Sequence, residues 1–147
     1  MNTHSRSGVH RVSGTAVLIV DDDADAAELY AIWLRSAGHR VSIVSDAARA
    51  LILAPVLRPT VAVVDIGLPD LDGIELLGLL QKLPQLTHCR YIAVSAYAGV
   101  GLPARCQRAG FEAFFEKPFN GRSLIASVAT ATRSEVKPEA RSARRTH

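Results

Sequence analysis

Residues 61–73 read VAVVDIGLPDLDG, an apolar run that ends in a carboxylate and passes into a loop of Gly, Pro and Asp. The run from Val61 to Val64 is typical of a strand that is buried on both faces of a parallel sheet. Beyond the loop, apolar residues recur at helical spacing: Leu76, Leu79, Leu80 and Leu83. A strand, a polar turn and a helix make one β-α unit, the repeating element of α/β folds.

The same alternation of strand and helix patterns extends along the chain. Short apolar runs predict strands at Ala16–Val20, Val41–Val44, Val61–Val64, Tyr91–Val94 and Ala113–Phe115. Segments with helical spacing separate them. We therefore predict a doubly wound α/β fold, a five-stranded parallel sheet with helices on both faces, because right-handed crossovers pack back onto the sheet. In such folds the functional crevice lies at the carboxyl ends of the strands.

Several residues mark where the helices begin and end. Asp23, Asp46 and Asn120 are predicted to cap helix N-termini with a side-chain oxygen. Gly38 should end the first helix. Pro55 should shorten or kink the last turn of the second, because proline lacks the backbone donor that a helix interior requires.

The positive charge of the chain lies mainly at its ends. The 147 residues carry a formal net charge of +3, but residues 15–132 hold 10 basic and 12 acidic side chains. A nucleic-acid partner is therefore not expected, because binding would need a basic face on the folded body. We expect a flexible segment at 1–14, one domain at 15–132 and a basic, disordered tail at 133–147, which leaves no room for an effector domain.

The sequence predicts neither export nor membrane insertion. The run Ala16–Val20 is too short for a signal peptide and leads directly into acidic residues. No apolar stretch reaches the roughly 20 residues that span a bilayer. Cys89 and Cys106 have no metal-ligand spacing. We expect a cytoplasmic protein with reduced thiols and no membrane partner.

Polar side chains follow four of the five predicted strands: Asp21, Asp22 and Asp23 after the first, Asp65 after the third, Ser95 after the fourth and Lys117 after the fifth. The strands are parallel, so Asp21, Asp22 and Asp65 should lie within several Å of one another. Two carboxylates about 4 Å apart repel by about 4 kcal/mol at an effective dielectric of 20, and Mg²⁺ is a natural counter-ion for them. Together with Lys117 and the Ser95 hydroxyl, they suit phosphoryl transfer to an aspartate.

Four motifs surround these residues: VLIVDDD (17–23), VVDIGLPDLDG (63–73), VSA (94–96) and EKPF (116–119). In order and spacing they resemble a response-regulator receiver domain, the phosphoacceptor half of bacterial two-component signalling. The resemblance implies a flavodoxin-like sheet with strand order 2-1-3-4-5. It also implies a cis peptide bond between Lys117 and Pro118.

The resemblance assigns a role to each polar residue. The implied Mg²⁺ ligands are Asp21, Asp22, Asp65 and the backbone carbonyl of Gly67. Asp65 is expected to be phosphorylated and Lys117 to contact the phosphoryl group. Ser95 is expected to be the switch hydroxyl and Phe114 the switch aromatic, although Phe114 would also suit the core.

A stand-alone, CheY-like response regulator follows from this resemblance. Such a protein accepts a phosphoryl group from a phosphohistidine of a histidine kinase or phosphotransfer protein. It catalyses only its own phosphorylation and dephosphorylation, and signals through a downstream protein or a phosphorelay. The helix at 103–109 and the last helix form the expected output face, which could also support a homodimer.

Two other functions remain compatible with the residues. One is a receiver-shaped adaptor that binds partners without phosphorylation. The other is a phosphohydrolase of the haloacid dehalogenase type with Asp21 as nucleophile, because Asp21 and Asp23 imitate its signature. Within the receiver interpretation, Tyr97 is predicted to screen the acyl phosphate from water.

Overall fold

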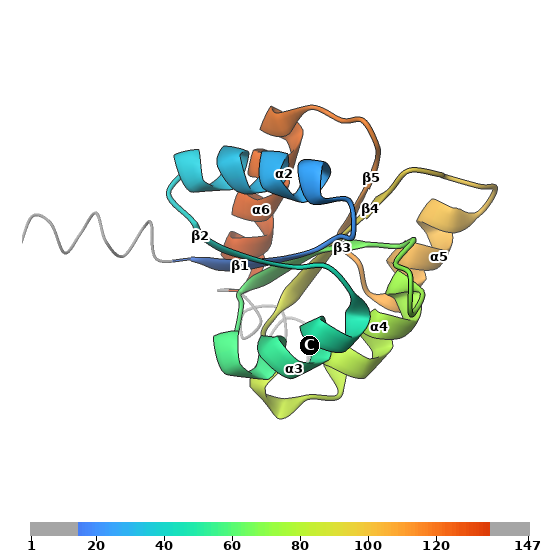
Figure 1. The fold of residues 1–147 in the computed structure, drawn as a ribbon, viewed down its shortest axis with the longest axis horizontal. Coiled ribbons are helices and arrows are strands. Elements are labelled where there is room, and N and C mark those ends of the chain that lie inside the picture. The colour runs from blue at the N-terminus through green and yellow to red at the C-terminus, as the bar shows by residue number, and fades with distance from the viewer. Residues whose placement is uncertain (1–14, 136–147) are drawn as a thin grey trace, which may run out of the picture.

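The computed structural model describes residues 15–135. Their elements, in chain order, are β1 (Ala16–Val20), α2 (Ala24–Ser36), β2 (Arg40–Val44), α3 (Ala47–Leu57), β3 (Val61–Asp65), α4 (Gly73–Gln81), the 3-10 helix η1 (Pro84–Leu86), β4 (Arg90–Ser95), α5 (Leu102–Ala109), β5 (Ala113–Glu116) and α6 (Gly121–Glu135) (Figure 1). Each predicted strand is present, with ends that differ by no more than a residue from the apolar run that predicted it.

The strands form one parallel sheet in the order β2-β1-β3-β4-β5. This confirms the doubly wound class and the expected 2-1-3-4-5 order. In the register of the sheet, Val20 of β1 lies opposite both Val44 and Val64. Strands β1 and β3 therefore end level with each other at the centre of the sheet, and the residues that follow them are brought together.

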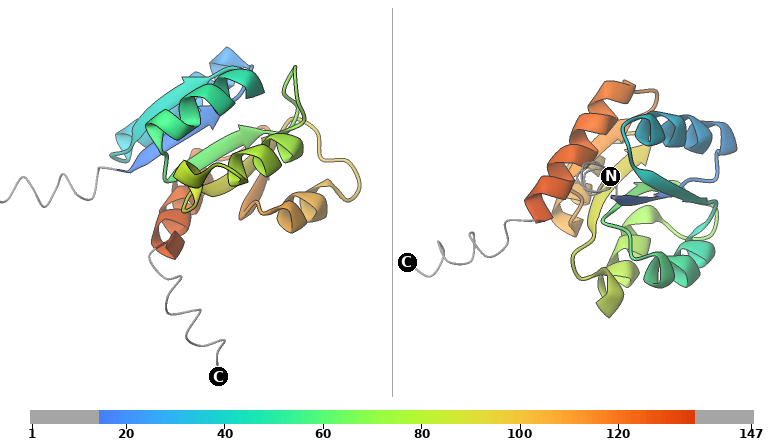
Figure 2. Two further views of the ribbon diagram at one scale, coloured as in Figure 1. Left: turned by 90° about the horizontal axis from the view of Figure 1, so that it is seen from below. Right: turned by 90° about the vertical axis from the view of Figure 1, so that its left-hand side faces the viewer.

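Helices cover both faces of the sheet, α2 and α6 on one face and α3, α4 and α5 on the other (Figures 1 and 2). Alternate residues of each central strand point to opposite faces. In β1, Val17 and Ile19 pack toward α2 and α6, whereas Leu18 and Val20 pack toward α3 and α4. Aliphatic burial on both faces makes the strand ends a rigid platform for polar side chains.

The predicted helix caps are confirmed. Asp23 accepts a hydrogen bond from the Ala26 N–H at 3.2 Å, and Asn120 accepts one from the Arg122 N–H at 2.7 Å. Gly38, two residues beyond the end of α2, adopts a φ of 98°, a backbone conformation that favours glycine. The peptide bond before Pro118 is cis, as the resemblance implied.

The structure differs from the sequence-based boundaries in three places. Helix α3 continues past Pro55 and ends before Arg58, which has a φ of 50°. The short helix η1 was not predicted. Helix α6 runs to Glu135, beyond the expected domain end at 132, because no Gly or Pro interrupts the sequence before Pro138. The predicted segment 1–14 and the rest of the predicted tail lie outside the described residues.

None of the helices within residues 15–135 is both long and apolar enough to cross a membrane.

Candidate functional site

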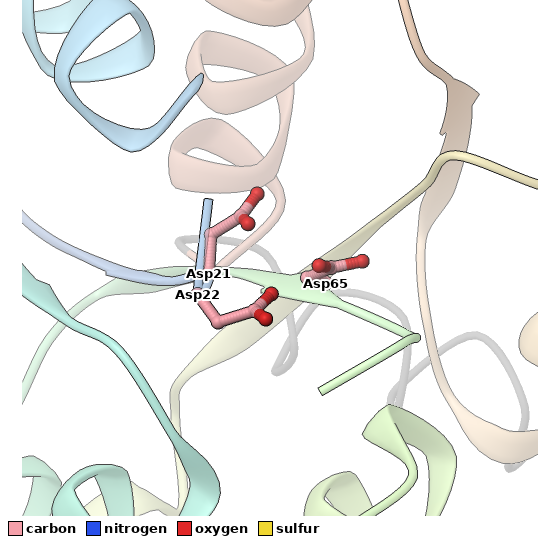
Figure 3. Close-up of side chains that lie close together, drawn as sticks. All are labelled: Asp21, Asp22 and Asp65. Atoms are coloured by element: carbon pink, nitrogen blue, oxygen red, sulfur yellow. The ribbon is translucent and has the colours of Figure 1, made fainter. Parts of the chain in front are cut away.

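Three carboxylates meet where β1 and β3 end. Asp21 and Asp22 follow β1, and Asp65 is the last residue of β3 (Figure 3). One oxygen from each lies within 4.8 Å of the other two. Asp21 and Asp65 are buried, with 1% and 5% of their surface exposed, and Asp22 is open to solvent. The structure therefore brings the three carboxylates together as predicted, and Asp22 is the one that faces the solvent.

Lys117 supplies positive charge to this cluster. It follows β5, and its backbone N–H donates to the Ser95 carbonyl at 2.8 Å. Its ammonium lies 2.9 Å from Asp21 Oδ2 and 3.5 Å from Asp65 Oδ2. Burial acts to lower the pKa of Lys117. The hydrogen bond to Asp21 and the charges of Asp21 and Asp65 act to raise it, and together they outweigh burial, so the pKa is raised. Lys117 therefore stays protonated at neutral pH.

Burial and the neighbouring negative charge both act on the pKa of Asp65. Burial, followed by the charge of Asp21, raises the pKa of Asp65 to about 6. The Gly67 N–H, which donates to Asp65 Oδ1 at 3.1 Å, and the charge of Lys117 partly oppose this shift. The same negative charges act on a neighbour from α2, since burial and then the charges of Asp21 and Asp65 raise the pKa of Tyr30.

Ser95 lies at the same edge of the sheet, but its hydroxyl is engaged elsewhere. Only 5% of the residue is exposed. Its Oγ donates to the Tyr97 carbonyl at 2.6 Å and accepts from the Tyr97 N–H at 3.1 Å. The hydroxyl proton is thus directed to the loop after β4, and contact with a group on Asp65 would require Ser95 to release Tyr97.

Gly67, two residues after Asp65, faces open space. A Cβ placed on Gly67 would have no atom within 4 Å. A cavity of about 470 Å³ begins there, and it is also lined by Ser95, Tyr97 and Arg105. Open space therefore extends from Gly67 to the loop after β4.

Phe114 lies apart from the carboxylates. It is half-buried on β5 and packs at the edge of the core beneath α5. It lines a separate cavity of about 200 Å³ with Cys106 and Phe111. Its role as a switch residue stays a prediction.

Sequence reasoning missed two acidic residues in the loop between β3 and α4. Asp72 caps α4 by accepting from the Ile74 N–H, and an Asp directly before a helical pattern could have indicated this. Asp70 accepts from the backbone of Ala47 and Ala48 in α3. No local signal marks that contact, because its partners lie 23 and 22 residues away in the sequence.

The donor set fits a hard divalent cation. Three carboxylates face one ammonium, so the cluster keeps an excess of negative charge when all are ionised. Carboxylate and carbonyl oxygens are the ligands that Mg²⁺ prefers, and Mg²⁺ commonly bridges such groups to phosphate oxygens. Three carboxylates that could hold such a cation and one lysine thus lie around one point, an arrangement compatible with phosphoryl transfer to a carboxylate.

Comparison with known proteins gives one consistent result. The family model of the response regulator receiver domain matches residues 17–129. The chain is 34% identical over 112 residues to an uncharacterised 14.6 kDa protein of Leptolyngbya boryana, covering 76% of this chain and 86% of that protein. It is 30% identical over 113 residues to the polar-differentiation response regulator DivK of Brucella anthropi, covering 77% and 92%. The crystal structure of a CheY-like receiver domain protein from Methanospirillum hungatei superposes with a TM-score of 0.78 at 30% identity, covering 84% and 98%.

Proposed function

The chain belongs to the response regulator receiver family, and on that basis we propose that Asp65 accepts a phosphoryl group from a phosphohistidine of a histidine kinase or phosphotransfer protein. An Asp65 oxygen forms a bond to phosphorus while the bond between phosphorus and the imidazole nitrogen breaks. The imidazole leaves with the electron pair and takes up a proton. The protein is then a signalling component rather than an enzyme acting on a separate substrate.

The observation that carries this proposal is the position of Asp65 beside two further carboxylates and the Lys117 ammonium. Asp21, Asp22, Asp65 and the Gly67 carbonyl would hold Mg²⁺, which would neutralise phosphoryl oxygens as they approach the carboxylates. Lys117, 3.5 Å from Asp65 Oδ2, is close enough to pair with a phosphoryl oxygen after a small displacement. Both features oppose the repulsion that an anionic donor would otherwise meet.

Phosphorylation would change the contacts of Ser95. The Oγ–H now bonded to Tyr97 would turn to the phosphoryl group and draw the loop at residues 96–101 inward. The surface formed by α5, β5 and α6, including Phe114, would shift in population between two states. Output then runs through a downstream protein, through a second copy at this surface or through onward phosphoryl transfer.

The alternatives differ in what they require of Asp21. A haloacid dehalogenase mechanism needs Asp21 as an accessible nucleophile, but its side chain is 0% exposed and is paired with Lys117. Family membership also argues against that mechanism. A phosphorylation-independent adaptor would need no chemistry at the site. The phosphorylation experiment below distinguishes it from the proposed phosphoacceptor.

The test is incubation with acetyl phosphate and Mg²⁺, followed by a phosphate-affinity gel. We expect modification of the wild type and of Asp25→Asn, a control at an exposed carboxylate on α2. We expect none in Asp65→Asn or in the presence of a chelator. Modification that survives Asp65→Asn would overturn the proposal. A wild type that neither this donor nor a panel of histidine kinases can modify would instead support the adaptor function.

A further inference from the structure

A single side chain, Asp70, ties the loop at residues 66–72 to helix α3. Its Oδ1 accepts a hydrogen bond from the Ala47 N–H and its Oδ2 accepts one from the Ala48 N–H, both at 3.0 Å. The bond from Ala47, and to a smaller extent the bond from Ala48, lowers the pKa of Asp70, so the carboxylate is ionised at neutral pH. The loop that follows Asp65 is thus joined to a helix from another part of the sequence.

The contact completes the N-terminus of α3. A helix begins with four backbone N–H groups that lack partners within the helix. Asp70 accepts from the first two, Ala47 and Ala48. Asp46 accepts from the others, through its side chain for Arg49 at 2.8 Å and its carbonyl for Ala50 at 3.1 Å. A negative charge is also favourable at this end of the helix dipole. Because Asp46 caps α3 independently, the helix does not depend on Asp70 alone.

The same corner of the fold also holds the acidic pair. The Asp21 N–H donates to the carbonyl of Val44 at 3.1 Å. Val44 ends β2, and α3 begins at Ala47. The short segment 44–48 therefore contacts Asp21 on one side and the loop, through Asp70, on the other. Its backbone thus connects the acidic pair to the loop through hydrogen bonds.

The backbone of Gly67 depends on how this loop is held. Its N–H donates to Asp65 Oδ1 at 3.1 Å. The two ends of the loop are joined by the bond from the Gly73 N–H to the Ile66 carbonyl at 2.9 Å. Gly67 itself is exposed and has no side chain to pack. Ile66 and Leu68, on either side of Gly67, are buried in the core, and Asp70 adds a polar anchor farther along the same loop.

We propose that Asp70 is a positioning residue for the phosphoacceptor site, because its bonds to Ala47 and Ala48 hold the loop so that Gly67 stays beside Asp65. For its role in metal binding, this inference rests on the function proposed above. The positioning itself is a property of the fold and is testable without metal.

The first test is Mg²⁺ titration by calorimetry of the full chain. Asp70→Ala should weaken Mg²⁺ binding by about tenfold, the usual loss when a residue that orients a metal ligand is removed. Asp70→Asn, which keeps one acceptor oxygen, should fall between Asp70→Ala and the wild type. Asp46→Ala is the matched control, because it removes the other carboxylate at the start of α3 and leaves the loop bonds in place. Equal affinities for Asp70→Ala and wild type, or equal losses in Asp70→Ala and Asp46→Ala, would overturn the proposal.

The second test needs no metal. In a chelator, amide hydrogen exchange at Gly67 should be about tenfold faster in Asp70→Ala than in wild type and unchanged in Asp46→Ala, because only the former frees the loop. If the wild type binds no Mg²⁺, the Mg²⁺ site of the proposed function is wrong. The exchange rate at Gly67 then still tests whether Asp70 positions the loop. If Gly67 exchange is unaltered in Asp70→Ala, the positioning role is wrong, and the proposed phosphorylation of Asp65 is unaffected by that result. Circular dichroism verifies folding, and Asp70→Asn serves in the same comparison if Asp70→Ala does not fold.

Discussion

The ammonium of Lys117 lies 2.9 Å from Asp21 Oδ2, nearer than the 3.5 Å that separate it from Asp65. Lys117 is therefore held mainly by Asp21 and only secondarily by Asp65, the expected phosphoacceptor. This pairing compensates a fully buried carboxylate in the unphosphorylated protein. It also leaves Lys117 within a short displacement of a phosphoryl group on Asp65.

Replacing Lys117 by Met should destabilise the metal-free protein. Two buried carboxylates lose their cation, and breaking a buried pair in this way costs several kcal/mol. We expect a decrease in the free energy of unfolding of about 2–3 kcal/mol, because Asp65 can relieve part of the repulsion by taking up a proton. Urea denaturation measures it, and added Mg²⁺ should restore part of the loss. Lys82→Met, at an exposed lysine, should change stability by less than about 0.5 kcal/mol; similar values for the two variants would contradict the compensating role.

The raised pKa of Asp65 predicts how stability depends on pH. With a pKa of about 6 in the folded protein against an ordinary value of 3.8, the folded state binds more protons than the unfolded state between these values. This group therefore lowers the free energy of unfolding as pH rises from about 4 to about 6, and the deficit persists above that range. Asp65→Asn should be more stable than wild type by about 1–2 kcal/mol at pH 7.5, and the difference should shrink toward pH 4.

Denaturation of both proteins in a chelator, at a series of pH values, measures this difference. Asp25→Asn provides the control, since its exposed carboxylate should give no gain in stability at pH 7.5. A stability difference between Asp65→Asn and wild type that stays constant over the whole series would show that the ionisation of Asp65 is not its origin.

Two glycines of α4 should respond in opposite directions to alanine. A Cβ on Gly73 would lie 2.6 Å from the Asp65 carbonyl oxygen and 2.7 Å from Ile66 Cα, which are backbone atoms that cannot easily move. Gly73→Ala should destabilise the protein by about 2–3 kcal/mol through overpacking. Gly78, in the same helix, has no atom within 4 Å of its Cβ position, so Gly78→Ala should stabilise it by about 0.5–1 kcal/mol. Thermal unfolding compares the pair, and a neutral Gly73→Ala would be inconsistent with the close approach.

Tyr97 is expected to slow hydrolysis of the acyl phosphate. Tyr97 is 75% exposed, and its ring packs so closely over Gly99 that a Cβ there would lie 2.7 Å from the ring. It lines the cavity that also contains Gly67 and Ser95. Tyr97→Ala should shorten the lifetime of phosphorylated Asp65 several-fold, and Tyr97→Phe should preserve it, because the ring and not its hydroxyl excludes water. An unchanged dephosphorylation rate in Tyr97→Ala would remove this role.

Much of the fold was predictable because its signals are local. Buried aliphatic runs such as Val61–Val64 indicate strands, and Asp23 and Asn120 indicate helix starts within a few residues. The strand order came from the family resemblance rather than from periodicity, and the sheet confirms it. The strand ends alone predicted that Asp21 and Asp65 share one edge of the sheet, since all the strands are parallel. Their close approach also requires β1 and β3 to be neighbours, as they are in the sheet.

The missed features depend on parts of the chain that are distant in sequence. Nothing near Asp70 indicates that it bonds α3, because that contact forms only after β2 and β3 take their places on either side of β1. The sequence likewise placed Ser95 at the site without indicating that its hydroxyl bonds Tyr97. Side-chain direction is set by neighbouring packing and hydrogen bonding, which a pattern of residue types does not contain.

The sequence by itself determined the class of the fold and the set of residues at its functional edge. Both follow from hydrophobic periodicity and from what stands at the end of each strand. Only the tertiary structure decided which partner each polar group takes: Lys117 with Asp21, Ser95 with Tyr97, and Asp70 with the start of α3. Hydrogen bonds and ion pairs act over a few Å, so their pairing is decided by the final positions of whole strands and helices.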